Sequence, residues 1–236
     1  MCGRYVSPEQ AAIERAWQIG RTNSNPFPRR YNVQPTTMVP LLVYDMSVLT
    51  LAAARWGLIP HWWKQEKPPR FTINARLEEA ASKPMWREPL RTGRCLLPAE
   101  GWYEWREVER TDPRTGEIVK AKQPHYIRRH DRQPFCFAGL MSTRAEPGAS
   151  DPLLTCAILT TAAAGPVAEV HERMPVVLPD DAHAEWLDPA LKDSSMASAL
   201  ARARTMSDAF THFPVRKLVN SARNEGPELI EPAQEA

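Results

Sequence analysis

Residues 38–56 read MVPLLVYDMSVLTLAAARW, and this stretch carries a clear strand signal. Its two apolar runs, 38–44 and 48–56, are rich in aliphatic and β-branched residues, which favour a pleated, half-buried surface. The short break between them, residues 45–47, is long enough for a tight connection. The stretch therefore predicts a β-hairpin.

The sequence beyond this hairpin continues the same pattern. Five further apolar or β-branched runs predict strands. These runs span 94–98, 102–108, 120–128, 134–141 and 153–160. The segment 112–116 (DPRTG) is typical of a turn between two of them. Because only a few short helical segments interrupt the strands, we expect a single α+β domain with a mostly antiparallel sheet.

Short helices are expected where capping residues precede a helical spacing of apolar residues. They span 7–18, 74–82, 181–187 and 194–204. In the first, Ser7 can cap the helix and Gln10 completes a capping box, whereas Asn74 is a suitable N-cap for the second. The side chains of the first helix expected to be buried are Ile13, Ala16 and Trp17. Residues 20–36 lack periodicity and predict an extended loop.

The composition excludes several classes of protein. With 236 residues, of which 43% are hydrophobic, the chain can build a sizeable core and is not a disordered chain. Its 30 Lys and Arg against 28 Asp and Glu leave a formal charge of 30 − 28 = +2, which excludes a histone-like protein. Any nucleic-acid partner must therefore contact a local cationic patch.

No signal for membrane insertion or export stands out in the sequence. The apolar stretch 153–164 is too short and too rich in Thr to span a bilayer, and no apolar signal-peptide core follows residues 1–5. The four cysteines lie far apart without a CxxC pair, which argues against a zinc knuckle or a disulfide framework. We expect a cytoplasmic protein without a metal or other cofactor, whose residues 231–236 form a disordered tail.

Cys2 is the most informative single position. Removal of Met1 before this small residue would leave an N-terminal cysteine, with an amine and a thiol on adjacent carbons. Such a residue can condense with an aldehyde to an imine, and the sulfur can then close a five-membered thiazolidine. The alternative is that a small residue simply follows the initiator, although Gly3 beside it allows a ligand to approach the backbone closely.

Other segments supply polar groups suited to such chemistry. Glu104 lies between two tryptophans that could exclude water and raise its pKa toward general acid–base duty, although strand alternation could equally place it on a wet face. His171 precedes a turn that ends in proline, where a histidine can be structural or catalytic. Arg76 falls in the first turn of an expected helix, where a cation is unfavourable toward the helix dipole and hints at an anionic ligand.

Seven short motifs together resemble one family. In chain order they are 1–5 (MCGRY), 31–36 (YNVQPT), 56–60 (WGLIP), 73–76 (INAR), 98–105 (PAEGWYEW), 137–140 (FAGL) and 171–175 (HERMP). This order resembles the SRAP family, named as SOS response-associated peptidases, whose members shield abasic sites in single-stranded DNA. The resemblance covers residues 2–230 and implies an SRAP-type domain with a curved sheet or pseudo-barrel. The segment 106–123 looks longer than in the most compact members, and its role is open.

The resemblance implies a covalent DNA–protein crosslink. Cys2, freed of Met1, would attack the ring-opened aldehyde of an abasic deoxyribose and close a stable thiazolidine, which shields the lesion. Asn74 would hold the Cys2 end and the adduct by hydrogen bonds. Glu104 would accept and return the proton of the α-amine, and His171 would deliver a proton to the sugar ring oxygen. These duties suit the residue types, because the imine step needs a neutral amine and ring opening needs a proton donor.

The resemblance also implies a DNA-binding surface. Its residues would be Arg4, Pro35, Trp62, Trp63, Arg76, Thr161 and Arg173. The arginines would bind phosphates, while Trp62, Trp63 and Pro35 would stack on or wedge between bases. The alternative for the tryptophans is that they pack in the core, and this alternative is strongest for Trp56. Stacking tolerates any sequence, which suits recognition of a missing base. The expected partner is single-stranded DNA with an abasic site, bound by a monomer.

Three other interpretations stay open. A thiol peptidase could use Cys2 as nucleophile and His171 as base, with removal of Met1 as its minimal activity. Class II glutamine amidotransferases also begin Met-Cys-Gly, but Arg4-Tyr5 breaks their pattern, in which apolar residues and then a glycine follow. A plain single-strand-binding module would need the arginines and tryptophans and would not depend on Cys2.

Overall fold

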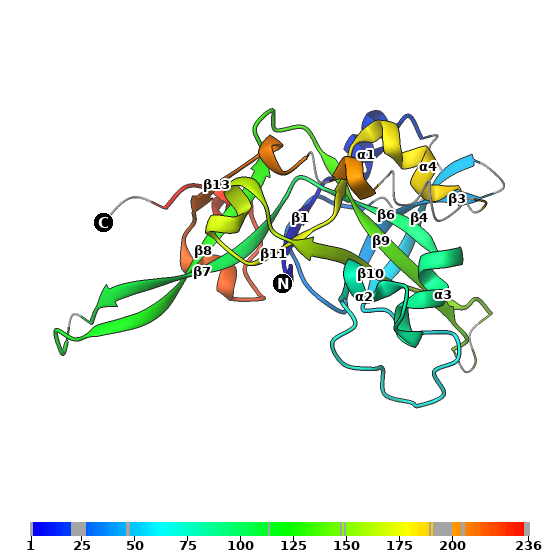
Figure 1. Cartoon of the computed structure of the whole chain (residues 1–236), viewed down its shortest axis with the longest axis horizontal. Coiled ribbons are helices and arrows are strands. Elements are labelled where there is room, and N and C mark those ends of the chain that lie inside the picture. The colour runs from blue at the N-terminus through cyan, green and yellow to red at the C-terminus, as the bar shows by residue number, and fades with distance from the viewer. Residues whose placement is uncertain are drawn as a thin grey trace.

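The larger of the two sheets closes into a five-stranded barrel (Figure 1). A computed structural model describes residues 2–19, 27–45, 48–112, 114–146, 148, 150–188, 190, 200–203 and 206–233. The barrel strands are β3 (Met38–Asp45), β4 (Val48–Trp56), β6 (Arg94–Ala99), β9 (Phe135–Arg144) and β10 (Leu153–Ala162). They close in the order β10-β4-β3-β6-β9 and back to β10, and each pairing is antiparallel except β10 with β4.

Strand β10 continues past the barrel and recruits two short strands. Residues 158–160 pair in parallel with β5 (Asn74–Arg76), and residues 160–162 pair antiparallel with β11 (Arg173–Pro175). Strand β12 (Val177–Leu178) pairs with β9 instead. Strand β10 therefore brings together β5 and β11, which lie about 100 residues apart in the sequence.

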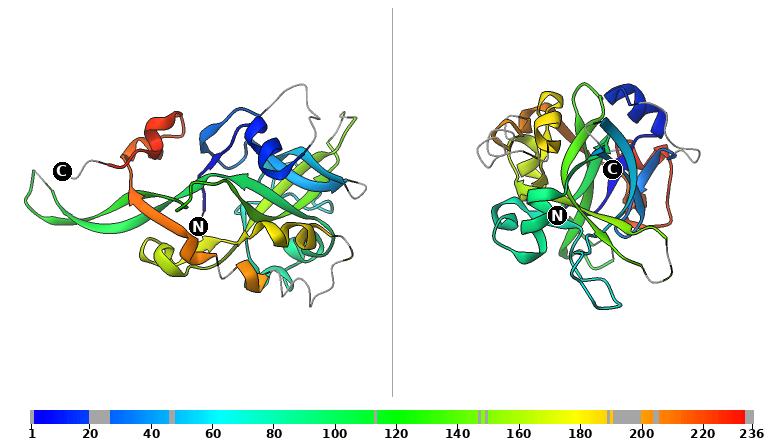
Figure 2. Two further views of the ribbon diagram at one scale, coloured as in Figure 1. Left: turned by 90° about the horizontal axis from the view of Figure 1, so that it is seen from above. Right: turned by 90° about the vertical axis from the view of Figure 1, so that its right-hand side faces the viewer.

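A second, antiparallel sheet packs against the barrel. Its strands are β1 (Tyr5–Ser7), β2 (Arg30–Val33), β7 (Gly101–Thr111), β8 (Ile118–Arg129) and β13 (Phe210–Pro214), in the order β13-β8-β7-β1-β2. The hairpin of β7 and β8 projects beyond the other strands in two perpendicular views (Figures 1 and 2). The two sheets together confirm the expected α+β domain with mostly antiparallel strands.

The helices are short and lie at the outside of the barrel. They are α1 (Gln10–Trp17), α2 (Leu77–Ala80), α3 (Pro84–Thr92) and α4 (His183–Leu187). Turns of 3₁₀ helix occur at η1 (Gly165–Glu169), η2 (Asp180–Ala182), η3 (Ser207–Ala209), η4 (Lys217–Asn220) and η5 (Pro227–Ile230). No helix in these described ranges has the length and hydropathy needed to cross a bilayer.

Alternate residues of the barrel strands feed two apolar clusters, as the two-residue period of a strand requires. One cluster packs against helix side chains such as Ile13, Trp86 and Trp186. The other joins the barrel to the second sheet, where Trp102 meets Phe137 edge-to-face with ring centroids 6.0 Å apart. Because Cys2 belongs to this second cluster, this residue is anchored between the two sheets.

Arg94 caps two helix ends at the start of β6. Its guanidinium donates hydrogen bonds to the carbonyl oxygens of Leu90 and Arg91 at the end of α3, and of Trp186 and Asp188 at the end of α4. A cation suits these electronegative termini, and the side chain is buried.

Arg94→Met is therefore expected to lower the free energy of unfolding by about 3 kcal/mol, because it leaves buried carbonyl groups without donors. Urea unfolding measures the change, and Arg91→Met, at an exposed position three residues earlier, is the control. A loss equal to that of the control would show that the four bonds contribute nothing.

Several boundaries differ from the sequence predictions because tertiary pairing overrides local signals. Ser7 belongs to β1 and not to a helix cap; α1 starts at Gln10 after Glu9, with no side-chain cap bond. The expected N-cap Asn74 is instead the first residue of β5, and Arg76 precedes α2. Within α1, Ile13 is buried as expected, whereas Trp17 is half-buried and Ala16 is exposed.

Other predictions were incomplete. The loop expected over 20–36 contains β2, and α3, β5, β11 and β13 were not predicted. Of the helix expected over 194–204, residues 200–203 are helical, and the remainder lies outside the described residues. In the expected tail, Pro232 forms a β-bridge with Val215, and residues 234–236 lie outside the described part of the chain.

Candidate active site

Asn74 fixes the Cys2 end of the chain. Its side-chain Nδ2 donates a 2.8 Å hydrogen bond to the backbone carbonyl of Cys2, and both residues are buried. The pairing of Asn74 with Ile158 in β10 sets the position of this amide. The Asn74 Oδ1 atom is buried and has no hydrogen-bond partner among the residues that the structure describes, so it can accept a bond from a ligand.

Glu104 is the buried carboxyl group of the site. Only 2% of its surface is exposed, which resolves the choice between a buried and a wet face, and burial raises its pKa from 4.5 to about 7. The residue opposite it on β8 is His125, which is also buried and whose pKa burial lowers to about 4. Because His125 is neutral at pH 7, it does not act as a cation that would stabilise the Glu104 carboxylate.

His171 is the second ionisable side chain beside Glu104. Its Nε2 atom lies 4.0 Å from the Glu104 Oε2 atom, and the backbone N–H of Arg173 donates a 2.9 Å bond to its Nδ1 atom. Burial lowers the pKa of His171, so the imidazole is neutral near pH 7. With Nδ1 accepting, the neutral ring carries its proton on Nε2, the atom that faces Glu104.

The Cys2 thiol is held in its protonated form. Burial raises its pKa well above 9.0, and the nearby carboxylate of Glu104 adds to the shift. A thiolate nucleophile needs the opposite, an electropositive and partly exposed setting that lowers the pKa. In this arrangement, sulfur chemistry requires a base to take the thiol proton, and the Glu104 carboxylate is close enough to affect the pKa of this thiol.

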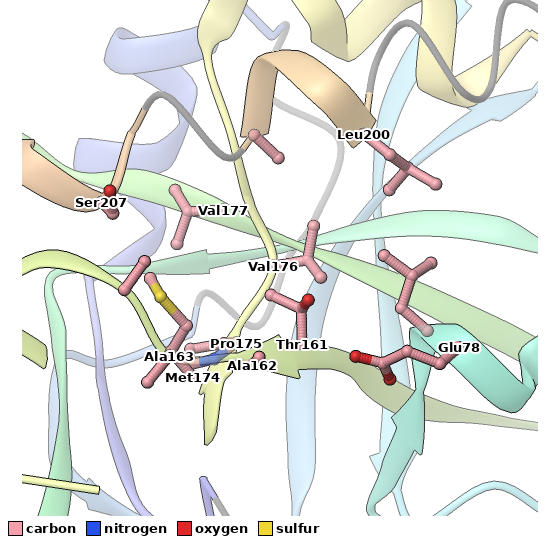
Figure 3. Close-up of a pocket in the computed structure, with 13 residues that line it drawn as sticks. Glu78, Thr161, Ala162, Ala163, Met174, Pro175, Val176, Val177, Leu200 and Ser207 are labelled. Atoms are coloured by element: carbon pink, nitrogen blue, oxygen red, sulfur yellow. The ribbon is translucent and has the colours of Figure 1, made fainter. Parts of the chain in front are cut away.

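Arg173 is engaged within the protein. Its guanidinium forms two 2.9 Å bonds with the carboxylate of Glu78 in α2 and donates a 2.8 Å bond to the carbonyl of Thr160. These bonds hold the pKa of Glu78 at about 2. Thr161 and Glu78 line an apolar hollow of about 270 Å³ beside this ion pair (Figure 3). A phosphate at Arg173 would compete with Glu78 for the guanidinium.

The other arginines expected at the site differ in availability. The half-buried Arg4 donates from Nη1 to the Asn32 side chain and to the carbonyl of Val219, so it ties the start of the chain to the C-terminal segment. Arg76 is exposed at the end of β5, with Glu79 at 3.6 Å. Arg76 therefore offers a more accessible cation than Arg4.

The expected stacking residues lie on loops. Trp62 is 41% exposed and its ring centroid lies 6.1 Å from that of Trp63, whose Nε1 donates to the carbonyl of Lys67. Pro35 is half-buried in the turn after β2. Trp56 is fully buried, which confirms the core-packing alternative for this residue. Direct contacts join Cys2 with Asn74 and Glu104 with His171; the two loop tryptophans belong to the segment between β4 and β5.

Two residues of this region were missed by sequence reasoning. Phe71 is 87% exposed, and its backbone adopts a left-handed φ of 60°, which is unfavourable for a bulky residue. An aromatic residue in a Pro- and Lys-rich loop was the available signal. His125 could have been found from its register opposite Glu104, but that register depends on the length of the intervening hairpin.

Comparison with known proteins identifies the family. Residues 1–222 match the family described as SRAP, SOS response associated peptidase. The abasic site processing protein YoqW of Bacillus subtilis (strain 168) is 39% identical over 98% of this chain and 99% of its own length. The abasic site processing protein YedK of Escherichia coli (strain K12) is 36% identical over 98% of this chain and 100% of its own length. The abasic site processing protein HMCES of Gallus gallus is 31% identical over 86% of this chain and 66% of its own length.

Solved structures agree with this match. A protein from Bacteroides thetaiotaomicron superposes with a TM-score of 0.78 over 99% of this chain and 100% of its own, at 22% identity, which supports the fold. A phage-related protein from Bordetella bronchiseptica superposes with a TM-score of 0.65 over 91% and 94%, at 34% identity. The resemblance found in the seven motifs is confirmed, and the chain belongs to the SRAP (SOS response associated peptidase) family.

Proposed function

We propose that this protein processes abasic sites in single-stranded DNA and forms a covalent thiazolidine crosslink through Cys2, exposed by removal of Met1. The observation that carries the proposal is the buried group at Cys2: its carbonyl bound by Asn74, and the Glu104 carboxyl with a pKa of about 7 lying 4.0 Å from His171. The naming of its relatives as abasic site processing proteins supports the same substrate.

The reaction would begin at the deoxyribose. His171 donates its Nε2 proton to the ring oxygen as the C1′–O bond breaks, while the C1′ hydroxyl proton passes by way of the Glu104 carboxylate back to His171, so that the aldehyde forms and the neutral imidazole is restored. The neutral α-amine of Cys2 attacks the aldehyde carbon, and its surplus proton passes to Glu104. Loss of one water gives the imine. The Cys2 sulfur then adds to the imine carbon, and the thiol proton goes by way of Glu104 to the nitrogen.

This order of steps suits the protonation state of the site. The amine acts first, so the raised pKa of the Cys2 thiol is no obstacle until the intramolecular ring closure. A thiol peptidase would instead need Cys2 as a thiolate at the start. The buried, protonated sulfur therefore favours crosslinking over general peptidase activity.

The exposed aromatic side chains of the loop between β4 and β5 would hold the strand. Phe71 and Trp62 are exposed to solvent, and Arg76 supplies a cation at the end of β5. Pro35, Trp63 and Thr161 would add contacts, as would Arg4 and Arg173. Stacking on such rings is independent of base identity, as a protein that recognises a missing base requires.

Phe71→Ala and Trp62→Ala are each expected to weaken binding of an undamaged single strand by about 5- to 150-fold, since stacking contributes about 1–3 kcal/mol per base. Fluorescence anisotropy with a labelled oligonucleotide measures the affinity. Val48→Ala, which removes another exposed apolar side chain from the barrel, is the matched control. Affinities equal to that of the control would remove both rings from the binding surface.

The proposed function is tested with a single-stranded oligonucleotide that carries one abasic site. Incubated with the protein and run on a denaturing gel, it is expected to give a slower band that survives denaturation. The undamaged oligonucleotide and a duplex around the same lesion serve as controls for the lesion and for strandedness. Absence of the band, from protein whose intact mass shows that Met1 is gone, would overturn the proposal.

A further inference from the structure

The outer part of the β7–β8 hairpin has no neighbouring strand among the described residues. We call residues 106–123 the arm. On one side, β1 pairs with β7 only at Gly101 and Trp102, and on the other β13 pairs with β8 only over residues 125–129. The arm therefore extends as a two-stranded ribbon with unpaired edges, most of its described residues are exposed, and both perpendicular views show it projecting from the body (Figures 1 and 2).

The register divides the charges of the arm between its two faces. One face carries acidic and basic residues opposite each other, because Glu107 pairs with Lys122 and Glu109 with Lys120. A 2.6 Å bond between Glu107 and Lys120 also crosses this face. We call it the neutral face, since each carboxylate there has an ammonium group beside it.

In the paired part of the arm, residues 106–111 and 118–123, the opposite face carries cations without carboxylates. Its cross-strand pairs are Arg106 with Gln123, Val108 with Ala121, and Arg110 with Val119. Arg110 donates a 3.2 Å bond to the Gln123 side chain, and among the described residues neither arginine forms an ion pair. We call this the arginine face. The arm as a whole is nearly balanced, with five basic and four acidic residues, so the asymmetry arises from the register.

The arginine face is continuous with the candidate active site. Strand residues two apart share a face, so Arg106 and Glu104 lie on the same side of β7, and Gln123 and His125 on the same side of β8. Arg106 is close enough to His125 to contribute to the lowered pKa of that histidine. A strand that leaves the site along this sheet thus meets Arg106 first and then Arg110.

We infer that the arginine face of the arm binds the single-stranded DNA that flanks the lesion. The two arginines are four positions apart on β7, or about 14 Å along the arm, so they can contact different phosphates of one extended strand. Between them, the aliphatic side chains of Val108, Ala121 and Val119 offer an apolar surface. Unpaired bases and sugars can use such a surface, whereas a duplex presents mainly phosphates, so the single strand is the better fit.

This inference rests on the proposed function only in placing the start of the DNA strand at the candidate active site, and its test uses undamaged DNA. The variant is Arg106→Gln with Arg110→Gln, and the matched control is Glu107→Gln with Lys120→Gln on the neutral face. Affinity is measured against salt for strands of about 5 and about 15 nucleotides, the range of known site sizes, and for a duplex of the longer length.

The arginine variant is expected to weaken binding of the longer single strand by about tenfold and to lower the slope of log K against log salt by about 1.4, or 0.7 for each lost phosphate contact. The short strand and the control variant are expected to show less than a twofold change. An equal loss on short and long strands, a loss on the duplex alone, or an equal loss in the control would overturn the inference.

The crosslinking gel separates the failure of this inference from the failure of the proposed function. Loss of salt-dependent binding in the arginine variant, with no abasic-site adduct from the parent protein, would support DNA binding by the arm and overturn the proposed crosslinking reaction. An adduct from both the parent protein and the arginine variant, with unchanged binding of long strands by the variant, would support the crosslinking reaction and overturn DNA binding by the arm.

Discussion

Cys2→Ala is expected to abolish the covalent adduct with abasic DNA completely and to leave reversible binding of the same strand within about threefold. The amine remains in this variant and can still form an imine, but the thiazolidine needs the sulfur, and an imine hydrolyses during denaturation. The groups proposed to hold the strand, such as Phe71 and Arg76, are untouched. A denaturing gel measures the adduct, and anisotropy at low protein concentration measures the binding.

The control for this variant is another buried thiol. Cys136 is also fully buried and free but lies in the cluster that packs against the helices, so Cys136→Ala removes one sulfur from the core without touching the site. It is expected to crosslink like the parent. A denaturation-stable band of normal yield from Cys2→Ala would contradict the mechanism, since no other residue can supply both nucleophiles.

Glu104→Gln is expected to slow adduct formation by about 10²- to 10⁴-fold, the usual contribution of a positioned general base. Glutamine keeps the shape of the side chain but cannot take the proton of the amine or of the thiol. Because the pKa of Glu104 is about 7, the ratio of parent to variant rate is expected to rise as the pH increases through 7 and then to level off. Single-turnover kinetics between pH 5.5 and 8.5, about two units across this pKa, measures the ratio.

The stability of the same variant shows whether it is folded and whether the pKa is raised. A raised pKa favours the folded state below the ordinary value of 4.5, and that contribution is lost as the pH rises through about 7. Glu104→Gln should therefore match the parent near pH 4 and exceed its free energy of unfolding by up to about 3 kcal/mol above pH 7. A rate ratio independent of pH, in a variant with this stability profile, would remove Glu104 from the proton-transfer steps.

The strands of the barrel could be predicted because each has a local signal. In the hairpin of β3 and β4, successive apolar side chains point to opposite faces of the sheet. All its pairs, from Met38 with Arg55 to Asp45 with Val48, are local in sequence. The closure of the barrel could not be predicted from local patterns, because the parallel pairing of Thr155 with Arg55 joins residues 100 positions apart; only the family resemblance implied a curved sheet or pseudo-barrel. Periodicity carries no information about such a partner.

The site residues could be named from motifs, but their geometry could not. Asn74 has the residue type of a helix cap, and only its pairing with β10 turns its amide toward Cys2, 72 residues away. Whether Glu104 is buried depends on Trp102 and the barrel beneath it, which alternation along β7 does not specify. The tautomer of His171 depends on a single bond from the Arg173 backbone.

The mass of the crosslinked N-terminal peptide tests the central claim most directly. After abasic DNA has reacted, the protein is digested with trypsin and the DNA with nuclease, and the peptide of residues 2–4 is analysed. The account predicts a peptide that begins at Cys2, lacks Met1, and carries the sugar fragment at the sum of both masses less one water, with neither free amine nor free thiol. An adduct on a lysine, or on a peptide that retains Met1, would contradict it.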